Sequence, residues 1–349
     1  MGVLLALAVA LWLLGAVMKV SRGARWAMIG ALYLAVLGVQ VLMPEGHALR
    51  TAIGGTPQGW FALGLVAALV VAYRLALGAL RRRAAPPAQA GTPKGPLSPT
   101  ELDRYARHIV LREVGGPGQR KLKEAKVLVV GAGGLGSPAL LYLGAAGVGT
   151  LGVVDDDIVS ASNLQRQVIH TDARIGMPKV FSAQAALSAQ NPFVEVRPYH
   201  RRLDAETAEA LFAEYDLVLD GSDNFDTRDM VNRAAVRTAT PLVAGAIAQW
   251  EGQVSLYDPA HGTPCYACIF PQAPAPGLAP SCAEAGVIGA LPGIIGSMMA
   301  MEAIKHITGA GQTLAGRMAV HDALYSESRV IALKRRADCP VCGGTGKAA

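Results

Sequence analysis

The sequence predicts an α/β protein: a mostly parallel sheet with helices on both faces that continues into antiparallel strands, preceded by three N-terminal transmembrane helices. Two observations predict the sheet. Short apolar runs alternate with helix-length segments over residues 126–244, as strands and crossover helices do in parallel sheets, and a glycine-rich turn follows the first run. The third observation is an apolar fraction of 52%, to which three N-terminal stretches of nearly bilayer-spanning length contribute most.

The N-terminal segment, residues 1–83, contains these stretches at about 2–18, 26–43 and 60–80. The first two are uncharged, and the third is interrupted only by Arg74. A cleaved signal peptide is the alternative interpretation of the first stretch, but Met1–Leu4 has no basic residue and no convincing cleavage site precedes the second stretch. We therefore expect three transmembrane helices.

Basic residues around these stretches predict their orientation. Lys and Arg concentrate between the first two stretches and directly after the third, at Lys19, Arg22, Arg25 and Arg81–Arg83. The only charged residues of loop 44–59 are Glu45 and Arg50. Because cytoplasmic loops are enriched in Lys and Arg, we expect a multi-pass protein of the inner (cytoplasmic) membrane whose remaining domain faces the cytoplasm.

The formal net charge of +6 belongs to the N-terminal part of the chain. Residues 1–98 contain nine of the 32 Lys and Arg but one of the 26 Asp and Glu, which leaves 23 basic and 25 acidic residues in 99–349. This balance argues against nucleic-acid binding through a basic patch. Residues 84–98 are rich in Ala, Pro and Gly and are predicted to form a flexible linker, so that residues 99–349 form a separate domain.

That domain begins at a capping-box pattern, Ser98–Glu101, and then alternates strands with helices. We expect strands at 126–130, 151–154, 194–198, 217–219 and 241–244, and helices at 135–146, 179–189, 205–214 and 226–238. Strand-like segments follow at 253–257, 317–321 and 330–333. The apolar stretch 283–308 could be a fourth membrane span, but Glu302, Lys305 and His306 near its end favour a buried or dimer-interface helix.

The turn after the first strand and the polar residues that follow it indicate a nucleotide triphosphate site. Its glycines (Gly131, Gly133, Gly134 and Gly136) let the backbone approach phosphate at a helix N-terminus, and Asp155 follows the next strand, where a carboxylate can hold ribose hydroxyls. A hydride-transfer enzyme would need no further cations. This chain continues with Asn163, Arg166, Gln167 and Lys179, which argues against an oxidoreductase.

Four cysteines form two matching pairs, Cys265/Cys268 and Cys339/Cys342. Two CxxC pairs supply four thiolates to one tetrahedral ion, usually zinc. A redox dithiol is the alternative, but it would leave the second pair unexplained. With four protein ligands and no open position, such a zinc ion would be structural, and it would tie the C-terminal tail to a mid-chain loop.

Residues 98–343 resemble the MoeB/ThiF/HesA family, the bacterial relatives of ubiquitin-activating enzymes, and within it most closely the MoeB branch of molybdopterin-synthase adenylyltransferases. The shared motifs are Arg104-Tyr-Ala-Arg107-His108, Gly131–Gly136, Asp155-Asp-Asp157, Ser162–Gln167, Pro178-Lys179, Asp220–Asn224 with Arg228 and Asn232, Glu251–Gln253 and both cysteine pairs.

The resemblance implies ATP-dependent adenylation of the C-terminal glycine carboxylate of a small ubiquitin-fold sulfur carrier ending in Gly-Gly, in molybdopterin or thiamine biosynthesis. It implies that Asp155 binds ribose, that Asn163, Arg166 and Lys179 hold the phosphates with support from Gln167, and that Asp223, followed by Asn224, supports Mg²⁺. It also implies that Arg107 reaches the phosphates from the neighbouring subunit of a homodimer.

Other residues keep two interpretations at this stage. Cys282 lies where family members have a loop near the adenylate, and it is either a covalent acceptor of the carrier or a loop thiol without an essential role. Arg104 either takes part in the site or forms an interface ion pair. His108 and His170 are expected to serve packing or capping.

The substrate also keeps alternatives. Relatives with the same chemistry adenylate a carboxylate on a small molecule, a peptide or a tRNA base, and a scaffold that only binds ATP is disfavoured because every chemically expected position is occupied. About seven residues follow Cys342, so we expect any sulfurtransferase to be a separate protein.

Overall fold

The computed structural model describes residues 2–18, 20–84, 97–273 and 285–343. The chain divides into two compact units, Met1–Ala88 and Gln89–Ala349, which are described separately. The expected linker lies almost entirely outside the described residues and stays a prediction.

The N-terminal unit consists of α1 (Gly2–Val17), α2 (Arg22–Leu42), α3 (Ala48–Ile53) and α4 (Pro57–Ala84). Polar side chains join these helices at one end. The Tyr33 hydroxyl in α2 donates to the carbonyl of Trp60 in α4 at 2.6 Å, and Gln40 and Trp60 both donate to the carbonyl of Gly54. Many large apolar side chains remain exposed on α1, α2 and α4, including Leu13, Leu34 and Leu65.

The expectation of three membrane spans is supported for one helix. Among the described residues, Gly23–Leu42 within α2 is long and apolar enough to cross a membrane by length and composition, and Leu7–Ala16 is apolar but shorter. The structure thus supports one candidate span where the sequence predicts three.

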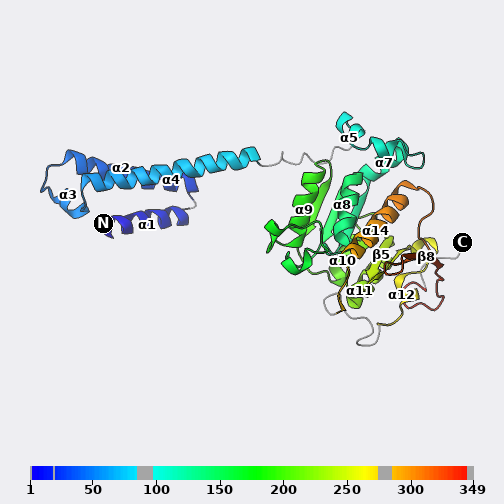
Figure 1. Ribbon diagram of the computed structural model, residues 1–349. Coiled ribbons are helices and arrows are strands. Elements are labelled where there is room, and N and C mark those ends of the chain that lie inside the picture. The colour runs from blue at the N-terminus through cyan, green and yellow to red at the C-terminus, as the bar shows by residue number, and fades with distance from the viewer. Residues whose placement is uncertain (1, 19, 85–96, 274–284, 344–349) are drawn as a thin grey trace. The chain divides into compact units, whose positions relative to one another are not determined.

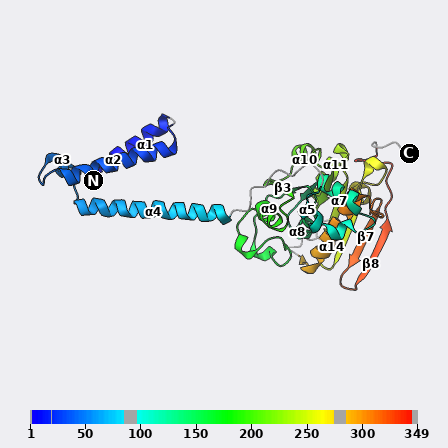
Figure 2. The same ribbon diagram turned by 90° about the horizontal axis from the view of Figure 1, so that it is seen from above.

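The second unit contains a single eight-stranded sheet, and its elements are shown in Figures 1 and 2. Its strands are β1 (Lys126–Val130), β2 (Thr150–Val154), β3 (Glu195–Tyr199), β4 (Leu217–Asp220), β5 (Leu242–Ile247), β6 (Glu251–Tyr257), β7 (Arg317–Asp322) and β8 (Glu327–Ala332). Its helices are α5 (Pro99–Arg104), α6 (Ala106–Ile109), α7 (Gly115–Glu124), α8 (Gly136–Ala146), α9 (Lys179–Gln190), α10 (Ala205–Phe212), α11 (Phe225–Thr238), α12 (Tyr266–Ile269) and α14 (Ala290–Thr308), with 3₁₀ turns at Ala161–Asn163, Asp172–Arg174 and Pro259–His261.

The strand order is β3-β2-β1-β4-β5-β6-β7-β8. The first five strands of that order are parallel, and β5 to β8 are antiparallel. This mixed, Rossmann-like sheet confirms the predicted fold class of the domain. From β1 the chain adds β2 and β3 on one side and then crosses back to add β4 on the other side. Open α/β sheets bind ligands at such a switch point, outside the carboxyl ends of the strands.

Two apolar cores cover the two faces of the sheet because successive side chains of a strand point to opposite sides. Val127 and Val129 pack with α8, α9 and α14, whereas Leu128 and Val130 pack with α10 and α11. The central strands β1, β2 and β4 are buried on both faces, which explains why they appear in the sequence as continuous apolar runs.

The apolar stretch that could have been a fourth span is α14. Ile295, Met299 and Ala303 are fully buried against the sheet, and the carboxylate of Glu302 accepts a hydrogen bond from the Leu314 amide at 2.7 Å. The helix begins at Ala290, later than the predicted residue 283, and is a core helix of the domain.

The first helix of the domain is anchored by a buried ion pair. Ser98 and Glu101 form the predicted capping box, and Glu101 also pairs with Lys123 of α7 at 2.9 Å. The capping box and the ion pair together hold the start of α5.

Candidate active site

The predicted nucleotide residues meet at the carboxyl edge of the parallel strands. The Gly131 amide donates to the Val154 carbonyl at the end of β2, and the Gly221 amide donates to the Val130 carbonyl at the end of β1. The loops after β1, β2 and β4 therefore lie side by side, as sequence-distant segments do when they follow adjacent parallel strands.

The turn after β1 has room only for glycine at two positions. Gly131 has φ of +90° and its α-carbon faces the carbonyl of Gly221. A Cβ on Gly136 would overlap the carbonyl of Gly131. These close contacts place the turn and Gly136, the first residue of α8, against the loop after β4. The N-terminus of α8 therefore faces the carboxyl edge of the parallel strands.

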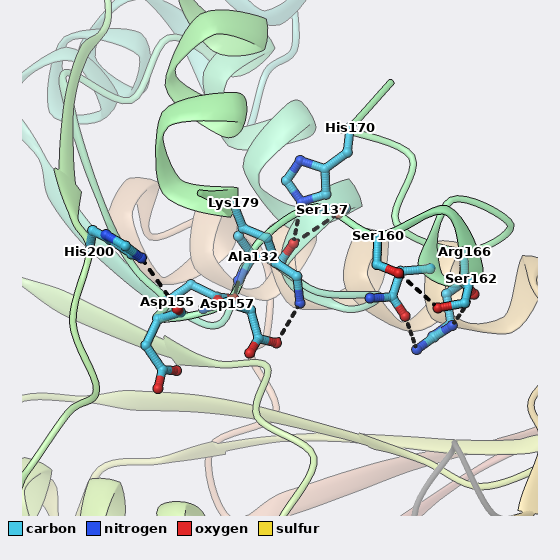
Figure 3. Close-up of polar contacts among 12 residues, drawn as sticks. Ala132, Ser137, Asp155, Asp157, Ser160, Ser162, Arg166, His170, Lys179 and His200 are labelled. Atoms are coloured by element: carbon cyan, nitrogen blue, oxygen red, sulfur yellow. Dashed lines mark hydrogen bonds and ion pairs between the residues drawn. The ribbon is translucent and has the colours of Figure 1, made fainter. Parts of the chain in front are cut away.

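Three side chains contact Ala132 in the middle of the turn (Figure 3): those of Asp155 and His170, and that of Ser137, whose hydroxyl donates to the Ala132 carbonyl at 3.4 Å. The carboxylate of Asp155 accepts from the Ala132 amide at 2.8 Å and from the Asp157 amide at 2.8 Å. On the other side, Nε2 of His170 lies 2.9 Å from the Ala132 carbonyl. Burial raises the pKa of Asp155, and the charge of Lys179 and the two amides offset this only in part.

Lys179 begins α9 and reaches the same edge of the sheet. Its ammonium group pairs with the Asp157 carboxylate at 2.8 Å. An antiparallel bridge between Ile158 and Pro178 and a bond from the Lys179 amide to the Asp157 carbonyl hold the two segments together. The acidic run after β2 therefore positions the lysine as well as Asp155.

Arg166 and Gln167 come from the loop after the first 3₁₀ turn. The guanidinium of Arg166 donates to Asn163 Oδ1 at 3.0 Å, and its side chain lies beside Gly134. Gln167 is buried next to Gly133, and its Oε1 has no hydrogen-bond partner within the described residues. The site thus contains a buried acceptor that a ligand donor or water could satisfy.

The loop after β4 supplies Asp223 and Asn224. Asp223 is exposed, whereas Asn224 caps α11 by accepting from the Thr227 amide at 2.9 Å. Buried Arg228 donates to the carbonyl of Ser222 and, at 2.7 Å, to that of Gly245. Arg228 therefore fixes the loop that presents Asp223.

The four paired cysteines form one buried cluster. Their Sγ atoms lie within 4.8 Å of one another, with separations of 3.7 Å between Cys265 and Cys339 and 3.5 Å between Cys268 and Cys342. Disulfides would need about 2.05 Å, whereas a tetrahedral ion with Zn–S bonds of about 2.3 Å places sulfurs about 3.8 Å apart. The donor set fits zinc.

Backbone and side-chain donors surround these sulfurs. The amide of Arg336 lies 3.5 Å from Cys268 Sγ, and Nδ2 of Asn232 lies 3.8 Å from Cys265 Sγ. Burial opposes the thiolate of Cys339, but the amides of Cys342 and Val341 stabilise it and lower its pKa to about 7. These donors favour the thiolate of Cys339, whereas burial raises the pKa of Cys265 and Cys342. Binding of a metal would favour the thiolate form of all four cysteines.

A family model for the ThiF family matches residues 105–341. The chain belongs to the ThiF family. This ThiF-family chain is 53% identical to the sulfur carrier protein adenylyltransferase of Thermus thermophilus over 247 residues, which cover 70% of this chain and 91% of the relative. It is 48% identical to the SAMP-activating enzyme E1 of Haloferax volcanii over 250 residues, covering 72% and 92%.

Longer relatives and solved structures show the same core. A probable adenylyltransferase/sulfurtransferase, MoeZ of Mycobacterium tuberculosis, is 49% identical over 71% of this chain and 64% of its own. Escherichia coli MccB with ATP has a TM-score of 0.61 at 22% identity, covering 69% of this chain and 74% of MccB. This structural likeness shows the fold of the ThiF-family domain.

One predicted residue of this ThiF-family chain, Arg107, is not brought into the cluster, and another, Cys282, cannot be placed. Arg107 on α6 is exposed and makes no hydrogen bond or ion pair within the described part of the chain. Cys282 lies outside the described residues. Arg104 donates to the Gln190 carbonyl at 3.0 Å and lies over the Phe193 ring, which gives it a structural role.

Three supporting residues of the ThiF-family site had no assigned role from sequence. Arg228 and Asn232 were recognised only as parts of a motif, and His170 was expected to pack or cap. Their partners are Ser222, Cys265 and Ala132. The spacing of residues along a chain does not reveal such partners, although the placement of Arg228 and Asn232 one and two helical turns after the Asn224 cap was a usable signal.

Proposed function

We propose that this chain uses ATP to adenylate the C-terminal glycine carboxylate of a small ubiquitin-like sulfur-carrier protein. The observation that carries the proposal is the meeting of the glycine turn, Asp155, Arg166 and Lys179 at the carboxyl edge of the sheet. The names of the two relatives that this chain matches over nine-tenths of their length, a sulfur carrier protein adenylyltransferase and a SAMP-activating enzyme, support the carrier as substrate.

The reaction needs alignment more than acid–base chemistry. A terminal carboxylate is ionised at pH 7, with a reference pKa of about 3.5. Its oxygen forms a bond to the α-phosphorus while the bond from that phosphorus to the bridging oxygen breaks, and pyrophosphate leaves with that electron pair. The protein has to bind both anions in line and neutralise charge on the leaving group.

The described residues suit those tasks. Each oxygen of Asp155 already accepts one amide hydrogen, and each retains a lone pair for a ribose hydroxyl. Arg166 and Lys179 supply cations, Asn163 orients Arg166, and Gly133 and Gly134 leave the backbone open to phosphate. We assign these roles by their placement beside the turn.

Asp223 is the proposed support for Mg²⁺. Its exposed carboxylate lies in the loop after β4, which packs against the glycine turn. Oxygen ligands from one carboxylate and the substrate phosphates match the usual Mg²⁺ environment. Mg²⁺ would neutralise charge on the departing pyrophosphate.

We propose that a second copy of the chain completes the site through Arg107. An open, mainly apolar hollow of about 620 Å³ lies between α8 and α14 and includes Tyr142, Val168 and Ile294. All three side chains are exposed. A second copy would cover this surface, and isologous pairing would supply the same arginine to both sites.

The N-terminal unit is proposed to hold the enzyme at the inner face of the cytoplasmic membrane. The support is the candidate span in α2 and the exposed apolar side chains of α1 and α4, together with the basic segments that favour a cytoplasmic catalytic unit. Three spans remain the proposed arrangement. The sulfur donor is proposed to be a separate protein.

The test is ATP–pyrophosphate exchange by the full-length protein in detergent, with each small ubiquitin-fold protein that ends in Gly-Gly from the same genome. We expect one carrier to support exchange, and Asp223→Ala to abolish it. The same carrier without its last glycine should be inactive. If no carrier supports exchange although the protein binds ATP measurably, the carrier assignment is overturned in favour of a small-molecule, peptide or tRNA carboxylate.

A further inference from the structure

His170 joins two parts of the site that are far apart in the sequence. Its imidazole is 6% exposed. Nε2 lies 2.9 Å from the Ala132 carbonyl in the glycine turn, and Nδ1 lies 2.9 Å from the hydroxyl of Ser182 in α9, the helix that begins with Lys179. Figure 3 shows the ring between the turn and α9.

The two partners determine the form of the ring. A carbonyl oxygen only accepts, so Nε2 must carry the hydrogen. Nδ1 of a neutral ring then accepts from the Ser182 hydroxyl. Burial lowers the pKa of His170, and the charges of Lys179 and Arg174 act in the same direction while Asp155 and the Ala132 carbonyl oppose them. His170 is therefore neutral at pH 7.

The contact controls the direction of a backbone amide. A trans peptide is planar, so a carbonyl held toward His170 points the following N–H, that of Gly133, to the opposite side. The Gly133 amide makes no hydrogen bond within the described residues. Glycine has no Cβ to resist rotation of this peptide, so contacts to the Ala132 carbonyl hold its orientation. The shorter contact is that of the His170 ring at 2.9 Å, and the Ser137 hydroxyl donates to the same oxygen at 3.4 Å.

We propose that His170 is a positioning residue that, as a neutral ring with hydrogen on Nε2, holds the Ala132–Gly133 peptide so that the Gly133 amide points to the nucleotide phosphates. The assignment rests on the proposed nucleotide function. His170 does not touch substrate. It acts through the glycine turn, and its second contact, to Ser182, links the turn to α9, the helix that begins with Lys179.

A pair of matched substitutions tests this role. His170→Gln keeps an N–H donor near the Nε2 position, whereas His170→Asn keeps one only near Nδ1. His170→Asn loses the hydrogen bond to the Ala132 carbonyl, and we expect its KM for ATP in the exchange assay of the full-length protein to rise about tenfold. In His170→Gln, KM should stay within about twofold of the wild-type value. The value of kcat should change less than KM in both variants.

His306→Gln is the control, because His306 is a partly buried histidine whose pKa is also lowered by burial, but it lies in α14 away from the turn. It should leave KM unchanged. Equal KM values for ATP in His170→Gln and His170→Asn would overturn the proposal.

Hydrogen exchange in the absence of nucleotide separates this proposal from the proposed function. Peptides covering residues 131–137 should exchange faster in His170→Asn than in wild type, and His170→Gln should resemble wild type. If the wild-type protein adenylates no carrier, the exchange pattern still decides whether His170 orders the turn. If adenylation is present but the turn exchanges equally in both variants, the positioning role is wrong.

Discussion

The ammonium group of Lys179 lies 2.8 Å from the carboxylate of Asp157, although the lysine side chain is 5% exposed and the aspartate side chain is 68% exposed. A buried cation is thus satisfied by a partner that remains in water. Because screening weakens an exposed partner, phosphate can join or replace Asp157 without first breaking a buried ion pair. The lysine is held ready for an anion at the turn.

Lys179→Met should lower kcat for adenylation by about 10²–10³-fold, because it removes a cation that would stabilise charge in the transition state. Asp157→Asn should cost less than tenfold, since the phosphate can replace the lost partner. Steady-state exchange kinetics measure both. Lys305→Met, which removes an ion-paired lysine in α14, is the control, and a similar loss there would show that the effect is not local.

Removing zinc should destabilise the domain without removing a catalytic group. At a free zinc concentration of about 100 times the Kd, a structural ion adds about 2.7 kcal/mol to the free energy of unfolding. A chelator should therefore lower Tm and release one zinc per chain. Asn232→Leu, which removes the donor to Cys265, should weaken zinc binding by about 10–100-fold. Competition with a coloured chelator measures the affinity, and an unchanged value would exclude this supporting role.

Arg107 and Lys179 should act from different subunits. Arg107→Ala and Lys179→Met should each be inactive alone. When the two variants are combined, dissociated and reassembled, the mixture should recover about a quarter of wild-type activity. Half of the dimers then contain one chain of each variant, and each such dimer has one intact site of two. Absence of recovery in verified mixed dimers would place Arg107 in the site of its own chain.

Deleting residues 1–97 should leave adenylation within about twofold of the full-length rate, because Ser98 and the Glu101–Lys123 pair that anchor α5 are retained. Deleting residues 1–101 removes that anchor, and loss of a buried partner costs about 3–5 kcal/mol. Thermal unfolding and exchange assays compare the two. A folded 98–349 protein without ATP–pyrophosphate exchange would contradict the expectation that the N-terminal unit is separable from the catalytic domain.

The fold should lose stability as the pH falls below about 6.5. The unfolded chain protonates histidine near that value, whereas burial lowers the pKa of His170 and His306 in the fold. The unfolded state then binds more protons, so the free energy of unfolding decreases with decreasing pH. Asp155, whose pKa is raised, acts in the opposite direction at lower pH.

Comparison of Tm at pH 7.5 and 5.5 measures this dependence, and each of His170→Gln and His306→Gln should lose less stability than wild type over that interval. Equal losses in wild type and both variants would show that neither histidine is responsible.

Local patterns in the sequence were sufficient for the sheet and most of the site. Strand and helix positions in the domain were predicted within a few residues, because buried strands and crossover helices have distinct lengths and apolar content. Hydropathy was less decisive for the N-terminal unit. It indicated three spans, whereas the described helices support one by length and composition.

The sequence by itself determined which chemical groups are present: the glycine turn, Asp155, Arg166, Lys179 and two cysteine pairs, each recognisable from spacing along the chain. Only the tertiary structure decided how those groups are supported. Asp155 and His170 hold the two sides of Ala132, Arg228 holds Ser222, and Asn232 faces Cys265. The physical reason is that adjacent parallel strands bring together loops separated by tens of residues, and a hydrogen bond between such loops leaves no periodic pattern in the sequence.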